Sequence, residues 1–225
     1  PDDALRRFSR IAGSLGAKAV FYQMLNENPW LLKMTVDLAA WSQYLTDILV
    51  ANPGLFDELV DALQTGQSKT VEEMKGELTE IAHAGDIADT LRAYKAGELL
   101  RIGVRDLIHS ARLEQTQGEL SDLAGAILAT QLNHTQRKHR ERHGEVKTPE
   151  GKPVGFAVLA LGKFGGREMN YGSDLDVIFF YSADGQTLEG LPAVTYFAQL
   201  AQELTRTTAT PTALGKFAGI PVPRV

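Results

Sequence analysis

The sequence predicts an α+β protein, in which an all-helical domain is followed by a smaller α/β domain. Apolar residues recur at helical spacing from the start of the chain to about residue 145. Residues 146–155 then form a connector that is rich in proline and glycine. After the connector come two short apolar runs and an amphipathic segment, with the lengths of two strands and a helix. We therefore expect a helical domain over residues 1–145 and an α/β domain over residues 146–225.

Two similar segments mark the beginning of the helical domain. Asn28-Pro29 and Asn52-Pro53 each follow one leucine and precede another at the same spacing. Asparagine accepts hydrogen bonds from the free amides of a first helical turn, and proline fits the first helical position. Each pair therefore predicts a helix start. The likeness arises either from duplication or from shared capping chemistry alone.

Three longer helices are expected after these, over residues 70–83, 86–110 and 118–143. Thr116 and Glu119 have the spacing of a capping box, just before the apolar positions of the last helix. The large aromatic residues of this domain fall at helical apolar positions, and we expect them to pack in the core: Trp30, Trp41, Tyr44 and Phe56.

The α/β domain begins with an unbroken apolar run over residues 156–161, which is typical of a strand buried on both faces. A glycine-rich turn leads to a second strand at about residues 175–181. A helix over about residues 191–206 follows. This order places the glycine-rich turn between two strands.

Composition limits the classes of function. The formal net charge of −5 argues against DNA or RNA as the macromolecular partner, because phosphate neutralisation supplies most of that affinity. Cysteine is absent, which excludes disulfides and thiolate metal sites and suits a reducing cytoplasm. No basic-apolar leader opens the sequence and no apolar run is long enough to cross a bilayer. We expect a cytoplasmic protein without a membrane or nucleic-acid partner.

Two carboxylates stand at the entry to the second strand. Side chains alternate along a strand, so Asp174 and Asp176 point one way, about 6–7 Å apart, and Leu175 and Val177 point the other. Paired carboxylates at this spacing suit a pair of hard cations such as Mg²⁺, which serve in-line phosphoryl displacement. Asp-x-Asp alone is common at solvated strand ends, so the surrounding residues decide its meaning.

Glycines and donors surround this pair. Gly172-Ser173 gives a tight turn whose amides and hydroxyl can face a polyphosphate. Further upstream, glycines let the backbone approach closely and two cations are available to neutralise phosphate charge: Gly162, Gly165 and Gly166, with Lys163 and Arg167. A Ser173 nucleophile would need a nearby base that the spacing does not supply, so a donor to phosphate is the preferred role.

The order of apolar strand, glycine-rich turn, Gly-Ser-Asp-x-Asp and apolar strand resembles the core of the DNA-polymerase-beta-like nucleotidyltransferases. The run from Phe156 to Tyr181 closely resembles the motif of the glutamine synthetase adenylyltransferase (glutamate–ammonia-ligase adenylyltransferase) family. The resemblance extends upstream through Tyr94–Leu107 and the Asn-Pro helices, over about residues 5–206.

The resemblance implies ATP as substrate and glutamine synthetase as the protein that receives AMP on a tyrosine. It implies Asp174 and Asp176 as the Mg²⁺ ligands and catalytic residues, Gly172 and Ser173 as phosphate contacts, and a site wall made by Gly162, Lys163, Gly165 and Gly166. The upstream helices favour the adenylylating C-terminal half of that family. The alternatives are the half that removes AMP by phosphorolysis, or a non-catalytic module that docks glutamine synthetase or a PII-type nitrogen-signalling protein. A nucleotidyltransferase for RNA or a small molecule ranks below these.

The sequence departs from the family at its C-terminal end. The family carries a third carboxylate on a later strand, whereas no Asp or Glu follows Glu203 here. Residues 207–225 do not resemble the family, and their prolines argue against a central strand. Asp184 and Glu189 are the remaining substitutes, in a loop. We expect a piece of a longer protein, cut or altered after about residue 206, with weak or absent turnover.

Two further features are interpreted conservatively. The basic segment over residues 134–143 could contact an acidic partner or phosphate, but a solvated helix end that complements the helix dipole is the preferred interpretation. Its order His139-Arg-Glu-Arg-His143 does not match the zinc-protease motif. Glu168 is a motif residue for which a structural bond within the turn is expected.

Overall fold

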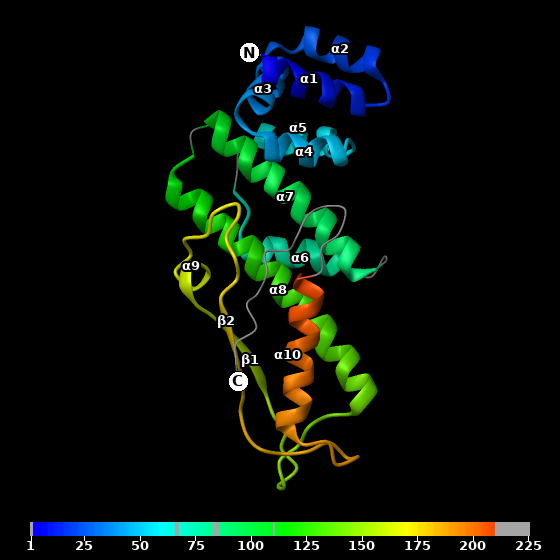
Figure 1. Cartoon of the computed structure of the whole chain (residues 1–225), viewed down its shortest axis with the longest axis vertical. Coiled ribbons are helices and arrows are strands. Elements are labelled where there is room, and N and C mark those ends of the chain that lie inside the picture. The colour runs from blue at the N-terminus through cyan, green and yellow to red at the C-terminus, as the bar shows by residue number, and fades with distance from the viewer. Residues whose placement is uncertain (1, 66–67, 83–85, 110, 210–225) are drawn as a thin grey trace. The chain divides into compact units, whose positions relative to one another are not determined.

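The computed structural model describes residues 2–65, 68–82, 86–109 and 111–209 (Figure 1). Its contacts divide the chain into two compact units. The first unit holds residues 1–69 and 92–120, and the second holds residues 70–91 and 121–225. The predicted change from helices to mixed structure does occur after residue 143, but the contact-defined units do not divide there. The domain boundary near residue 145 stays a prediction.

The first unit is helical. Its described residues form α1 to α5 and parts of two long helices, α7 from Arg92 and α8 up to Leu120: α1 (Asp2–Ser14), α2 (Lys18–Glu27), α3 (Pro29–Trp41), α4 (Gln43–Ala51), α5 (Leu55–Thr65), α7 (Ile87–His109) and α8 (Leu113–His143). One core joins α1 to α5, in which Phe21 meets Phe56 edge to face at 5.3 Å. Leu100 and Val104 bring α7 into the same core.

The Asn-Pro pairs separate helices as predicted, but the asparagines cap the preceding helix. Asn28 Nδ2 donates to Met24 O at 2.9 Å, and Asn52 Nδ2 donates to Ile48 O at 2.9 Å. The side chain of Asn28 makes no capping hydrogen bond to α3, although Pro29 occupies the first position of that helix. The linkers are so short that the free carbonyls of the helix behind compete with the amides ahead.

The aromatic residues of this unit are only partly in the core. Phe56 is buried as predicted. Trp41 is 75% exposed, and Trp30 and Tyr44 are also exposed, so core packing was the wrong prediction for these three. The helix α3 is apolar on nearly every side, and Leu31 and Leu38 occupy the face that meets the core.

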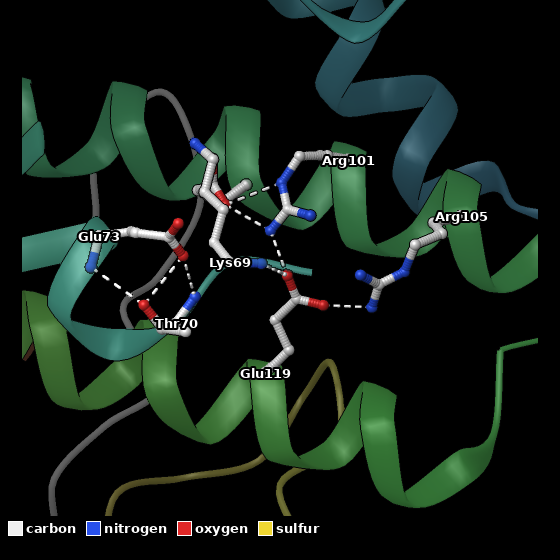
Figure 2. Close-up of polar contacts among 7 residues, drawn as sticks. Lys69, Thr70, Glu73, Arg101, Arg105 and Glu119 are labelled. Atoms are coloured by element: carbon white, nitrogen blue, oxygen red, sulfur yellow. Dashed lines mark hydrogen bonds and ion pairs between the residues drawn. The ribbon is translucent and has the colours of Figure 1, made fainter. Parts of the chain in front are cut away.

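A buried ionic network occupies the junction of α7 and α8 (Figure 2). Glu119 accepts from Arg101 at 2.5 Å, from Arg105, and from the Lys69 N–H at 2.9 Å. Glu98 accepts from Arg101 at 2.7 Å and from Lys69 Nζ at 2.7 Å. The predicted capping box of Thr116 and Glu119 is therefore wrong. The helix α8 begins at Leu113, which leaves both residues inside it.

The second unit combines helices with a small sheet: α6 (Val71–Ile81), the first turn of α7, α8 from Ser121, β1 (Phe156–Ala160), α9 (Gly162–Gly165), β2 (Val177–Tyr181) and α10 (Ala193–Ala209). A capping box of Thr70 and Glu73 starts α6. The Thr-x-x-Glu spacing of this capping box is a local signal in the sequence. The chain is thus α+β, as predicted.

The strands β1 and β2 pair antiparallel, with Phe156 opposite Tyr181 and Ala160 opposite Val177. One face of the sheet packs on α10, where Phe197 stacks on Phe156 at 5.3 Å and on Tyr181 at 5.3 Å. The opposite face is exposed, although its residues are apolar: Ala157, Leu159, Ile178 and Phe180. The prediction that the first strand is buried on both faces is therefore wrong for the described residues, because α10 covers one face only.

No helix in the described ranges is long and apolar enough to cross a membrane.

Candidate functional site

The loop between β1 and β2 holds the predicted metal and nucleotide residues, from Gly162 to Asp176. It turns directly from β1 into the short helix α9, which Gly162 begins in the left-handed region at φ +54°. A Cβ atom on Gly165 would lie 2.6 Å from the carbonyl oxygen of Ala160, so only glycine fits beside the end of β1. These two glycines fold the chain back on itself within one turn.

Gly162 also makes room for one of the two aspartates. A Cβ atom on Gly162 would overlap Oδ2 of Asp176. A backbone hydrogen bond also holds the start of α9 beside Asp176. The Leu161 N–H donates to Asp176 O at 2.8 Å, one residue beyond the last strand pair. The Asp176 carboxylate therefore lies directly against the backbone at the start of α9.

Asp174 and Asp176 lie in the extended segment that leads into β2, slightly before the strand predicted to carry them. Both side chains are exposed, while Leu175 is 6% and Val177 is 5% exposed. This alternation has the period of two expected of extended chain. The two carboxylates therefore lie on the solvent side of the segment and the two apolar side chains on the other.

The Gly172-Ser173 turn is closed by its own residues. The Asn170 N–H donates to Ser173 Oγ at 2.8 Å, and the Ser173 N–H donates to Asn170 O at 3.0 Å. A Cβ on Gly172 would meet nothing within 4 Å. The serine oxygen stabilises the turn as an acceptor, and its hydroxyl proton can still be donated to a ligand.

The two cations of the motif have different surroundings. Lys163 is exposed on α9. Arg167 is bound to α8, where its guanidinium donates to both oxygens of Asp122 at 2.6 and 2.9 Å. These hydrogen bonds raise the pKa of Arg167, and the charge of Asp122 adds to the shift. Arg167 was predicted to be available to neutralise phosphate charge, whereas in the structure its guanidinium is paired with Asp122.

Glu168 contributes a bond to the turn through its backbone. Its N–H donates to Lys163 O at 2.8 Å, and its side chain is exposed. A Cβ on the exposed Gly166 would lie 3.6 Å from the Glu168 carboxyl carbon. The bond within the turn was predicted, although the main chain rather than the carboxylate makes it.

The candidate substitutes for a third carboxylate lie elsewhere. Asp184 and Glu189 follow β2, whereas Asp174 and Asp176 precede it, and a strand of five residues spans about 17 Å. Asp184 lines a hollow of about 580 Å³ with Glu145 and Lys147 instead. Within the described ranges, no group of three or more acidic or histidine side chains is placed to hold a metal.

The basic end of α8 packs partly on α10. His139 is buried, with its ring 4.5 Å from that of Tyr196 and 4.6 Å from that of His143. Its Nδ1 lies 3.7 Å from Glu203 Oε2. Burial lowers the pKa of His139, and the neighbouring His143 adds to this shift. The prediction of a solvated helix end holds for the exposed Arg137, Lys138, Arg140 and Arg142, but not for His139.

The residues of α8 that hold the loop were not found from the sequence: Ser121, Asp122 and Gly125. Ser121 Oγ accepts from the Met169 N–H at 3.4 Å. A Cβ on Gly125 would lie 3.9 Å from the buried Phe164 ring. These residues lie some 40 positions upstream of the motif, and no local pattern marks them.

Comparisons with known proteins agree on one family. The model of the family described as glutamate-ammonia ligase adenylyltransferase matches residues 32–217. The match includes residues 207–217, so the expectation that the segment after residue 206 departs from the family is wrong for these residues. Residues 210–225 lie outside the described structure.

Among curated relatives, proteins named bifunctional glutamine synthetase adenylyltransferase/adenylyl-removing enzyme are similar over most of the chain. The relative from Alteromonas mediterranea is 32% identical over 94% of this chain and 23% of its own length. Those from Rhizobium meliloti and Chromobacterium violaceum are 30% and 32% identical over 95% of this chain, and 22% and 23% of their own lengths. The chain thus spans somewhat less than a quarter of these relatives. It belongs to the glutamate-ammonia ligase adenylyltransferase family.

Proposed function

We propose that the chain carries a nucleotidyltransferase site that moves AMP from Mg-ATP to a tyrosine of glutamine synthetase, and so regulates nitrogen assimilation. The observation that carries the proposal is the exposure of Asp174 and Asp176 on one side of the segment entering β2, directly after a Gly-Ser turn. The names of the relatives support the substrate and the type of reaction.

The aspartate pair fits the chemistry of Mg²⁺, which binds carboxylate oxygens and keeps several waters. Both side chains are exposed to solvent and so accessible to a metal ion. The motif arginine that would most readily neutralise them is held by Asp122. Two carboxylates on one side of the chain repel each other unless a cation lies between them. When bound, the metal would activate the attacking oxygen and stabilise the leaving one.

The remaining motif residues would bind and orient the nucleotide. Gly172 and the Ser173 hydroxyl are proposed to contact the phosphates. The turn uses the Ser173 hydroxyl only as an acceptor, so its proton can be donated to a phosphate, and the space beside Gly172 is open. Lys163 would neutralise phosphate charge from α9. Gly162, Gly165 and Gly166 would form the wall, because they keep side chains away from Asp176 and the end of β1.

The proposal includes a polymerase-beta-like core within residues 146–225 and a helical domain within residues 1–145. The antiparallel β1–β2 pair, joined by a glycine-rich loop with aspartates at the second strand, supports this core. Turnover by this chain is expected to be slow, because no third carboxylate lies beside Asp174 and Asp176 within the described ranges. The family setting and the absence of cysteine support a cytoplasmic location.

The first experiment measures ATP affinity by calorimetry, with and without Mg²⁺. The double variant Asp174→Asn with Asp176→Asn is expected to lose the Mg²⁺-dependent part of the affinity. The control is Asp184→Asn, which removes an aspartate after β2 and should bind as the parent chain does. If the double variant keeps full Mg²⁺-dependent binding, the site proposal is wrong and a docking module for glutamine synthetase or a PII-type protein is favoured.

The second experiment distinguishes the two directions of reaction, since the relatives are named for both. Labelled ATP is incubated with unmodified glutamine synthetase, and separately phosphate is incubated with its adenylylated form. Incorporation of AMP into protein supports the proposed direction. Release of ADP from the modified form alone would instead assign the phosphorolytic, AMP-removing reaction.

A further inference from the structure

The position of the glycine-rich loop depends partly on α8, in addition to the hydrogen bonds within the loop itself. Its residues are mostly exposed, and between Gly162 and Gly172 only Phe164 and Met169 are buried. Phe164 lies against Gly125 of α8, and the Met169 N–H donates to Ser121 Oγ. The loop is therefore attached to α8 on both sides of Arg167.

Arg167 itself adopts a backbone conformation that arginine rarely takes. Its φ is +58°, and it is the one non-glycine residue with positive φ within the described ranges. This region is unfavourable for a residue with a Cβ atom, whereas glycine adopts it freely. Such strain persists where the surroundings hold the residue in place. We therefore expect the Arg167 guanidinium to make a contact that glycine could not make.

The Arg167 guanidinium makes such a contact with a carboxylate of α8. It forms a two-pronged pair with Asp122, with N–O distances of 2.6 and 2.9 Å. The Asp122 side chain is only 15% exposed, against 60% for Arg167. Arginine presents two parallel donors to a carboxylate, which fixes orientation as well as distance. Lysine would keep the charge but lose this geometry.

From this geometry we propose that Asp122 and Arg167 form a clamp that positions the loop, and through it Asp174 and Asp176, for nucleotide binding. The clamp rests on the function proposed above and assigns Arg167 a positioning role rather than a contact with phosphate. The path is short: Met169 is bonded to α8, Asn170 and Ser173 close the next turn, and Asp174 follows. A change in the position of Arg167 is therefore expected to displace Asp174 and Asp176.

The two roles of Arg167 predict opposite effects of Asp122→Asn. If Arg167 positions the loop, loss of the Asp122 charge loosens the loop, and affinity for ATP with Mg²⁺ falls about tenfold. If Arg167 contacts phosphate, the same variant releases it for that contact, and affinity is unchanged or rises. Arg167→Lys is expected to weaken binding to a similar degree. The exchanged pair Asp122→Arg with Arg167→Asp is expected to recover part of the loss.

A second measurement follows the clamp without nucleotide. Hydrogen exchange of the Glu168 and Met169 amides, which are bonded to Lys163 O and Ser121 Oγ, should speed up about tenfold in Asp122→Asn. The control is Glu141→Gln, an exposed change on the same helix, which should leave both readouts and the melting temperature unaltered. If the parent chain binds no ATP, the proposed function fails while exchange still tests the clamp.

Equal or tighter ATP binding by a folded Asp122→Asn, with unchanged exchange at Glu168 and Met169, overturns the clamp. If Asp122→Asn does not fold, Arg167→Lys decides by the same two readouts. Full affinity and full protection in that variant would show that the two-pronged geometry is dispensable, and the proposal would be withdrawn.

Discussion

Removal of the Glu119 carboxylate should strongly destabilise the first unit. The side chain is 2% exposed and accepts from Arg101, Arg105 and the Lys69 N–H (Figure 2). In Glu119→Ala, Arg101 and Arg105 both lose this carboxylate, while the pair of Arg101 with Glu98 remains. Breaking one partner out of a buried ion pair costs about 3–5 kcal/mol, because the remaining charge stays out of water.

The assay can report on this unit alone. The chain has two tryptophans, Trp30 and Trp41, and both lie on α3 of the first unit. Tryptophan fluorescence in urea therefore follows the unfolding of this unit. A loss of about 3–5 kcal/mol in the free energy of unfolding would lower the melting temperature by about 10 °C, at about 2–4 °C per kcal/mol for a chain of this size. The control Glu114→Ala, on the same helix, removes an exposed pair with Arg112 and should cost about 0–0.5 kcal/mol.

A loss below about 1 kcal/mol in Glu119→Ala would refute this reasoning. It would mean that the two arginines find water or other partners when the carboxylate is removed. Glu119→Gln separates charge from hydrogen bonding, since the amide oxygen still accepts. Its cost should lie between those of the alanine variant and of the control.

Two further predictions concern the second unit. Gly162→Ala forces a Cβ atom onto the Asp176 carboxylate at a φ of +54°, so Mg²⁺-dependent ATP binding should weaken at least tenfold, whereas Gly76→Ala in α6 has open space and should leave binding unchanged. Calorimetric titration of ATP checks both variants, and equal affinities would show that Asp176 moves aside freely. Because burial lowers the pKa of His139 below the unfolded value of about 6.5, the unfolded chain binds the proton first. The stabilising contribution of His139 is therefore complete above about pH 6.5 and decreases as the pH drops towards the folded pKa. Denaturation midpoints measured at intervals from pH 7.5 to 5 should fall less in His139→Gln than in the parent chain. Parallel curves for the two proteins would contradict this assignment.

Local patterns were sufficient where one short-range rule decides the structure. The alternation of Asp174 and Asp176 with Leu175 and Val177 follows from the period of extended chain, and the structure keeps it even before β2 begins. The glycine-rich turn was also predictable, because Gly165 leaves no alternative beside the end of β1.

Long-range contacts explain what the sequence did not predict. Glu119 has the spacing of a capping residue, yet two arginines from α7 give its carboxylate stronger partners within the helix. Arg167 looks like a phosphate ligand until Asp122, 45 residues upstream, is placed beside it. Trp41 has an apolar side chain at a helical position, but nothing local shows which side of α3 meets the core.

The interleaved order of the units has a consequence for biosynthesis. The core of the first unit needs Leu100 and Val104, which emerge from the ribosome only after residues 70–91 of the second unit. Helices α1 to α5 must therefore wait for α7 with part of their apolar surface uncovered. Since synthesis adds about 5–20 residues per second, that delay lasts a few seconds, during which the uncovered apolar surface is prone to aggregation.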